Sequence, residues 1–194
     1  ASPAADEQDL SFALIHPIAN LPRPIDVRTF WDDNACNNLC DFRNYISHHV
    51  STMPERYPAS NMIVLTGVVG YKRQKGRKRV HPDYVEAMLK CKIIVLAQRD
   101  KWEDHMRLDE ALLSGALVLT DPAIYHQHGI VTEGDQQNIV VYHSISELEL
   151  KILYYLDPNN EAERIAIGAR GREAALAYHR GWHRAERLLL NDMM

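Results

Sequence analysis

The stretch HMRLDEALLSGALVLTDP, residues 105–122, begins with ionisable side chains that could bind a phosphate group. Arg107 and Glu110 are three positions apart, so they share one face of the helix that this stretch predicts. The first turn of a helix offers unpaired backbone amides and the positive end of the helix dipole, and both favour a diphosphate. Arg107 would add a planar guanidinium whose donors match phosphate oxygens. These residues predict an anion site at the start of the helix.

Each residue of this group also has a structural interpretation. Arg107 and Glu110 could form an ion pair on a solvated helix face, worth about 0.2–0.5 kcal/mol. His105 could contact phosphate, but a capping role is the simpler expectation. Trp102 could stack on a base, although an aromatic residue in a loop beside a core more often serves packing. The functional interpretation requires that the helix start faces the open edge of the sheet and is not blocked by Trp31.

Short apolar runs alternate with helical patterns along most of the chain. The helix after the first run carries Leu39, Phe42, Ile46 and Val50 at helical spacing, which predicts a buried stripe. The alternation predicts an α/β fold with a doubly wound parallel sheet covered on both faces, followed by a helical C-terminal extension from residue 144. Ligands of such sheets bind at the carboxyl ends of the strands. The predicted strands are 25–31, 61–67, 92–98, 116–121 and 138–144.

The most basic stretch follows the second predicted strand, on the ligand side of the sheet. Its six cations exceed what one diphosphate needs, so nucleic acid and an acidic protein are rival partners. The net charge of -4 and the lack of interleaved aromatic residues argue against nucleic acid. A solvated run of charges is the alternative for any one of these side chains. The cations are Lys72, Arg73, Lys75, Arg77, Lys78 and Arg79.

The length of 194 residues suits a single domain, which we place at residues 25–194 after a tail and proline-containing connector at 1–24. Hydrophobic residues make up 46% and charged residues 25%, as in soluble globular proteins. No apolar run approaches the roughly 20 residues that a membrane span requires. The chain starts with Ala rather than Met, so a processed or excised N-terminus is expected. The sequence does not assign the cellular compartment, and an organelle or the secretory lumen is compatible with it.

The three cysteines do not make a disulfide framework. Cys36 and Cys40 are four positions apart, and His48 and His49 follow. Zinc is conceivable there, but the spacing lacks the second ligand pair of a finger, so we expect no metal. Buried or half-buried free thiols, Cys91 among them, are the favoured interpretation.

Several common nucleotide and hydrolase motifs are missing from the chain. There is no GxGxxG after the first predicted strand and no GxxxxGK[ST], which argues against nicotinamide enzymes and P-loop NTPases. The lack of GxSxG argues against an α/β-hydrolase. Asp32 and Asp33 are typical of a phosphoacceptor receiver, but the third acid that this class needs is displaced to Asp100 and the chain is too long.

Three segments together resemble the carboxy-terminal half of GT-B glycosyltransferases, with the CgeB-like and group 1 branch nearest and some likeness to exostosin domains. The segments are YVEAMLKCKIIVLAQ, RLDEALLSGALVLTD and ISELELKILYYLDPNNEAERIAIGARGREAALAYH. The likeness is clearest over residues 84–179 and extends to 26–190 when the weaker first half is counted. It implies a Rossmann-like, donor-binding domain that takes a nucleotide-diphospho-sugar for metal-independent glycosyl transfer to an acceptor hydroxyl, with no cofactor. The catalytic base of such enzymes usually comes from an amino-terminal half, so the catalytic residue is unassigned here.

The resemblance assigns roles to individual residues. Glu110 matches the acid that accepts hydrogen bonds from the ribose hydroxyls, and Arg107 stabilises the leaving diphosphate. Gly115 allows the sharp turn from the helix into the next strand. The family often uses a basic residue from the region of Lys72 to meet the diphosphate. The full set of predicted donor-binding residues is Arg107, Glu110, His105, Lys72, Arg73 and Arg99.

Two departures from the family pattern favour an alternative function. The first strand of the family usually ends in a glycine that lets the backbone approach the ligand, whereas TFWDD puts Trp31, Asp32 and Asp33 there, which would crowd and repel a diphosphate. Many group 1 enzymes also carry an earlier glutamate at the position of Trp102. The alternative is an inactive glycosyltransferase-like subunit or scaffold in a larger assembly. The expected partners are a nucleotide sugar and an amino-terminal GT-B half or other protein subunits.

Overall fold

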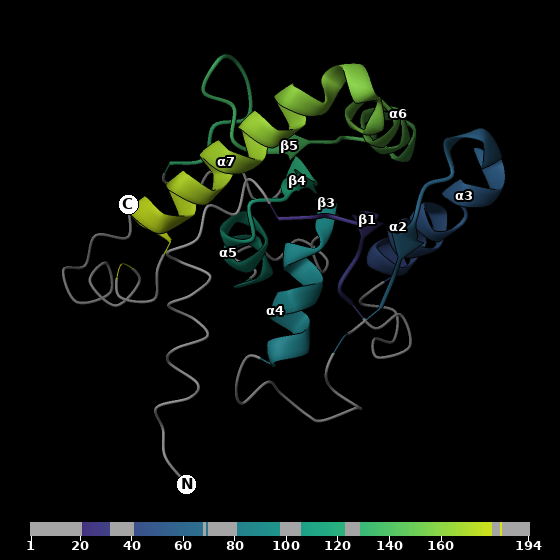
Figure 1. The fold of residues 1–194 in the computed structure, drawn as a ribbon, viewed down its shortest axis with the longest axis horizontal. Helices are drawn as coiled ribbons and strands as arrows, with labels where there is room; N and C mark the ends of the chain where they lie inside the picture. The colour runs from purple at the N-terminus through teal and green to yellow at the C-terminus, as the bar shows by residue number, and fades with distance from the viewer. Residues whose placement is uncertain are drawn as a thin grey trace, which may run out of the picture.

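The centre of the molecule is a five-stranded parallel sheet with the strand order β2-β1-β3-β4-β5 (Figure 1). Its strands are β1 (Ile25–Arg28), β2 (Val64–Leu65), β3 (Cys91–Val95), β4 (Leu117–Thr120) and β5 (Val140–Val141). The computed structural model describes residues 21–31, 41–67, 69, 81–97, 106–122, 129–179 and 183. The prediction of a parallel α/β sheet is therefore confirmed.

The two middle strands β3 and β4 are buried on both faces. Ile93 pairs with Leu117 and Ile94 with Val118, and all four side chains are at most 1% exposed. Because successive side chains of a strand point to opposite faces, an uninterrupted apolar run is needed when both faces are covered. The runs IIVL and LVL in the sequence have this composition.

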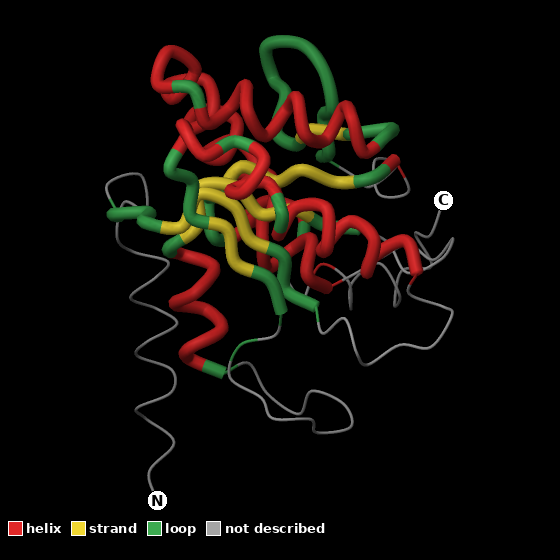
Figure 2. The backbone as a smooth tube through the Cα atoms, turned by 90° about the vertical axis from the view of Figure 1, so that its right-hand side faces the viewer, coloured by secondary structure: helices red, strands yellow, loops and turns green. Residues whose placement is uncertain are grey.

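Helices cover both faces of the sheet (Figure 2). On one face, α2 (Asp41–Ser51) and α6 (Ile145–Leu156) pack against the sheet through buried side chains such as Ile46 and Ile152. On the other face, α4 (Pro82–Leu89) and α5 (Met106–Leu113) do so through Met88 and Leu112. The long helix α7 (Glu161–Tyr178) adds side chains to both clusters. The remaining helical segments are α3 (Met53–Arg56), η3 (Pro58–Ser60) and η5 (Pro158–Asn160).

Local sequence signals explain where two of these elements begin and turn. Ser144 caps α6 by accepting a hydrogen bond from the backbone of Glu147, whose carboxylate accepts one from the His143 backbone at 2.7 Å. This pair resembles a capping box, except that the Glu147 carboxylate accepts from the residue before the N-cap. Gly115 turns the chain from α5 into β4 with a φ of 70°, as predicted, and only glycine adopts this left-handed conformation without strain.

Two sequence predictions about burial were wrong. The sheet was expected to be covered on both faces at every strand, but β2 is a two-residue edge strand whose Leu65 is 40% exposed, and Ile63 just before it is 50% exposed. An edge strand has a neighbour on one side only, so its side chains are less covered. Phe42 was expected on the buried stripe of α2, but it is 46% exposed, whereas Arg43 and Ser47 of that helix are buried.

The inward face of α2 keeps Ile46 and Val50, both fully buried, and also includes Arg43 and Ser47, which make polar contacts near the end of β1. Ser47 shares a buried hydrogen bond of 3.3 Å with Thr29, and the Arg43 guanidinium lies 5.1 Å from the centre of the Trp31 ring. The spacing of apolar residues does not predict such polar contacts. Within the described residues, no helix is both long and apolar enough to span a membrane.

Candidate functional site

The strand order places the expected ligand crevice between β1 and β3. The chain moves outward from β1 to β2 and then returns to the other side of β1 to form β3. Ligands of open α/β sheets bind at such a reversal, outside the carboxyl ends of the strands. β3 leads to α5, and α5 leads through Gly115 to the parallel strand β4. The start of α5 therefore lies at the carboxyl edge of the sheet, as the functional interpretation requires.

Two of the predicted donor-binding residues lie on α5 within the described part of the chain. Arg107 is the second residue of the helix and Glu110 the fifth, and both side chains are half-buried. The other four predicted residues lie outside the described residues, as do Trp102, Asp32 and Asp33. These four are His105, Lys72, Arg73 and Arg99.

Glu110 is held by a contact that the sequence analysis did not include. The hydroxyl of Tyr84 in α4 donates a hydrogen bond of 2.7 Å to Oε2 of Glu110. Tyr84 is only 5% exposed, and its ring meets that of Phe30 edge to face at 5.3 Å. A carboxylate offers about four acceptor positions on its two oxygens. The contact with Tyr84 orients Glu110.

Trp31 does not block the start of α5. Its side chain is 3% exposed and belongs to the cluster beneath α2 and α6, whereas α5 packs on the opposite face of the sheet. The indole Nε1 donates to the Arg43 carbonyl at 3.0 Å, which fixes the ring there. The expectation that the indole would crowd a ligand at this helix was therefore wrong, because the strand directs that side chain to the other face.

A buried polar group at the same edge was missed by the sequence analysis. Asp121 directly follows β4 and is 5% exposed, and Tyr142 directly follows β5 and is 1% exposed. The Tyr142 hydroxyl donates to the Leu96 carbonyl at 2.7 Å. Burial raises the pKa of Tyr142, the Asp121 charge raises it further, and the Arg43 charge opposes both. A buried acid and a buried guanidinium thus lie close enough to Tyr142 to influence its ionisation.

Only part of this polar group had a signal in the sequence. Thr120 and Asp121 end an apolar strand at the ligand edge, a position where polar residues often have a function. The Thr120 hydroxyl is buried without a hydrogen-bond partner, which is unusual for a polar atom in a core. Arg43 lies in the first turn of α2, and nothing in the local sequence distinguishes it from a surface cation.

The described residues contain no group of three or more metal-ligating side chains. Cys91 is a buried free thiol, and burial raises its pKa to about 12, so it remains protonated and inert. The structural interpretation of this cysteine is confirmed. Cys36 and Cys40 lie outside the described residues, so the interpretation of that pair stays a prediction.

Comparison with solved structures shows the class of this fold. The crystal structure of TarM matches with a TM-score of 0.54 at 14% sequence identity, over 90% of this chain and 36% of TarM. The crystal structure of the GtfA/B complex matches with a TM-score of 0.52 at 13% identity, over 82% of this chain and 34% of that one. The chain thus has the fold of a GT-B glycosyltransferase domain and spans about a third of the length of these structures.

The family is shown by the sequence. The family model described as glycosyl transferase-like matches residues 36–190, which is most of the chain. The chain therefore belongs to this glycosyl transferase-like family. A comparison with curated proteins gave no match.

Proposed function

We propose that this domain binds a nucleotide-diphospho-sugar and presents it for transfer of the sugar to an acceptor hydroxyl. The observation that supports this most is the position of α5, which starts at the carboxyl edge beside the β1–β3 reversal and carries Arg107 and Glu110. Membership of a glycosyl transferase-like family agrees with this use of the edge.

The proposed roles follow from the charges at the start of α5. The diphosphate lies against the first amides of the helix, where the dipole and the Arg107 guanidinium stabilise the negative charge that grows as the sugar departs. Glu110, oriented by Tyr84, accepts hydrogen bonds from the ribose hydroxyls. His105, Lys72, Arg73 and Arg99 are further donor contacts in this proposal. Because fixed dipoles and guanidinium groups neutralise the leaving group, the proposed reaction needs no metal.

The chain supplies one half of the proposed catalytic unit. It covers 36% of TarM and 34% of the GtfA/B chain, so the acceptor site and catalytic base belong to a second half or subunit in this proposal. The buried Asp121 and Arg43 beside the carboxyl edge are the described groups best suited to contact the sugar hydroxyls. Carboxylates and guanidinium groups accept and donate the hydrogen bonds that a sugar offers.

Ligand titration of the purified chain tests the proposal. UDP, GDP and the corresponding sugar nucleotides are added while binding is followed by calorimetry. We expect saturable binding with a Kd on the order of micromolar that weakens roughly tenfold or more in Arg107→Ala and Glu110→Ala, because each removes a charge-assisted hydrogen bond. Lys90→Ala and Glu86→Ala are the matched controls, since they remove an exposed ion pair at the far end of α4.

Failure of this titration would favour a second candidate function, a non-catalytic subunit or scaffold. The observation in its favour is the exposed edge of the sheet at β2, where Ile63 and Leu65 are 50% and 40% exposed. The fold neighbour GtfA/B is itself a complex, and an exposed edge strand offers a surface for a protein partner. The absence of binding at millimolar ligand, together with an intact fold, would support the scaffold and refute the donor site.

A further inference from the structure

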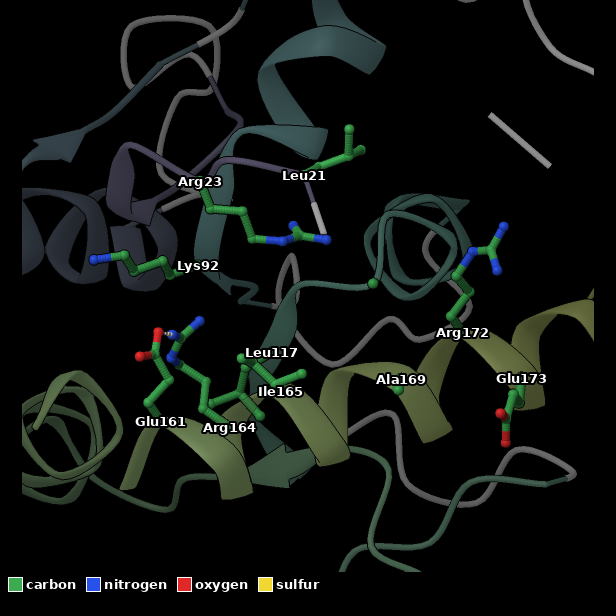
Figure 3. Close-up of a pocket in the computed structure, with 11 residues that line it drawn as sticks. Leu21, Arg23, Lys92, Leu117, Glu161, Arg164, Ile165, Ala169, Arg172 and Glu173 are labelled. Carbon is green, nitrogen blue, oxygen red and sulfur yellow. Dashed lines mark hydrogen bonds and ion pairs between the residues drawn. The ribbon is translucent and has the colours of Figure 1, made fainter. Parts of the chain in front are cut away.

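A pocket lies at the edge of the sheet opposite the start of α5, at the amino ends of the strands (Figure 3). It has a volume of about 320 Å³. Arg23 precedes β1, Lys92 is at the start of β3, Leu117 starts β4, and Arg164 comes from the first turns of α7. Because α5 starts at the carboxyl edge, this pocket is separate from the proposed donor site.

Two arginines of this pocket lie near one another, Arg164 buried and Arg23 half-buried. Arg23 donates hydrogen bonds of 2.7 Å to the carbonyls of Cys91 and Ser114, which hold its guanidinium in place. Arg164 is 5% exposed and donates to Glu161 at 2.6 Å. Burial is the largest cause that lowers the pKa of Arg23, to about 10, and the charge of Arg164 lowers it further. The guanidinium groups of Arg23 and Arg164 therefore repel each other in this poorly solvated pocket.

The other charges of the pocket are largely balanced. Lys92 is paired with Asp26 at 2.7 Å. Burial lowers the pKa of Arg172, and the charge of the nearby Glu173 opposes this effect. Arg164 is paired with Glu161, whose side chain is mostly exposed. Among the described residues, Arg23 donates to the neutral carbonyls of Cys91 and Ser114, so the excess of positive charge in the pocket is centred on Arg23, next to Arg164.

One wall of the pocket is aliphatic. Leu117 of β4 and Ile165 and Ala169 of α7 line it, with Leu21 on the side of Arg23 (Figure 3). Ile165 and Leu21 are 41% and 39% exposed, which is high for large apolar side chains next to a cavity. A ligand that covers them would remove apolar surface from water at about 25 cal/mol per Å².

We propose that this amino-edge pocket binds a small organic oxyanion, with a carboxylate or phosphate head between Arg23 and Arg164 and a short aliphatic body on Leu117 and Ile165. The head offsets the repulsion between the two guanidinium groups, whose planar donors match its oxygens. The aliphatic body covers the exposed apolar wall. The site would let a small acid influence this domain from the edge remote from α5.

Titration of the full chain with inorganic phosphate, acetate and isovalerate, followed by amide NMR shifts, tests this proposal. We expect saturable shifts near Arg23 and α7, with Kd on the order of millimolar, and tighter binding of isovalerate than of acetate because only isovalerate reaches the apolar wall. Arg164→Gln should weaken binding about tenfold or more. Lys90→Gln, which removes an exposed cation outside the pocket, should leave it unchanged.

A second variant protects the test against a loss of folding in Arg164→Gln. Ala169 is exposed on α7 and lines the pocket, so Ala169→Glu adds a carboxylate there with little risk to the core. We expect it to abolish binding of all three anions while the spectrum stays folded. Unsaturated or scattered shifts in the wild-type chain, or equal affinity in Ala169→Glu and the wild type, would overturn the proposal. Arg107→Ala, which targets the donor site, should not alter these titrations.

Discussion

Gly168 lies where α7 crosses the turn between α5 and β4, and this crossing brings two backbones together. A Cβ atom at this position would lie 2.5 Å from the Gly115 carbonyl oxygen and 3.2 Å from the carbonyl carbon of Ala116. Both neighbours are backbone atoms of a tight turn, in which Gly115 has a φ of 70°. Neither can move aside as a flexible side chain could, so the helix itself would have to shift.

The expected cost of Gly168→Ala follows from two opposing effects. Overpacking a well-packed contact costs about 1–3 kcal/mol, and backbone neighbours place this contact at the upper end of that range. Replacing a helical glycine by alanine recovers about 1 kcal/mol of helix propensity. The free energy of unfolding should therefore fall by about 1–2 kcal/mol. For a chain of this size that corresponds to a drop in Tm of roughly 2–8 °C.

Urea unfolding followed by circular dichroism measures this change. Ala169→Gly is the matched control, because it lies next to Gly168 on an exposed position and reports helix propensity without the contact. It should cost about 1 kcal/mol. If Gly168→Ala were as stable as the wild type or more stable, the close crossing of α7 over the α5–β4 turn would be refuted, because propensity alone would then account for the result.

Three further predictions concern individual side chains. Glu149→Gln should lower the free energy of unfolding by about 1–2 kcal/mol, because the carboxylate accepts a hydrogen bond from Arg56. That bond is the largest of several causes that lower the pKa of Glu149 to about 2. The stabilisation is therefore complete above the ordinary pKa of 4.5 and is lost as the pH falls towards 2. Glu149→Gln should lose less stability than the wild type in acid denaturation over this pH range. Tyr84→Phe should keep the fold but weaken nucleotide binding several-fold in calorimetry, since it removes only the hydroxyl that orients Glu110; unchanged binding would contradict the orienting role. In a variant with Cys36 and Cys40 replaced by serine, Cys91 should react with a thiol reagent only on unfolding, because burial raises its pKa to about 12. Fast labelling of the native chain would contradict this, because it would show that the thiol is accessible.

The elements that could be predicted are those with strong local signals. β3 and β4 are uninterrupted apolar runs, and their burial on both faces follows directly from that composition. α5 was expected between them, and Gly115 was expected at its end, because helix spacing and a terminal glycine are properties of adjacent residues. The assignment of the family also rested on the order and spacing of such segments, and it is confirmed.

The position of a strand in the sheet and the face to which a side chain points could not be predicted from local sequence signals. β2 has an apolar sequence like a central strand, but it lies at the edge because β3 returned to the other side of β1. Trp31 follows β1 at the ligand edge, yet its indole packs on the face away from α5. Both facts depend on which strands become neighbours, and that choice is made among residues far apart in the chain.

The sequence by itself determined the alternation of strands and helices, the apolar centre of the sheet and the cation and acid on α5, because each depends on residues within a few positions of one another. Only the tertiary structure decided that Tyr84 orients Glu110, that Arg43 and Asp121 lie near Tyr142, and that Arg23 lies near Arg164. These groups come from separate elements, and the contacts between them depend on long-range packing. The local periodicity of the sequence does not predict such contacts.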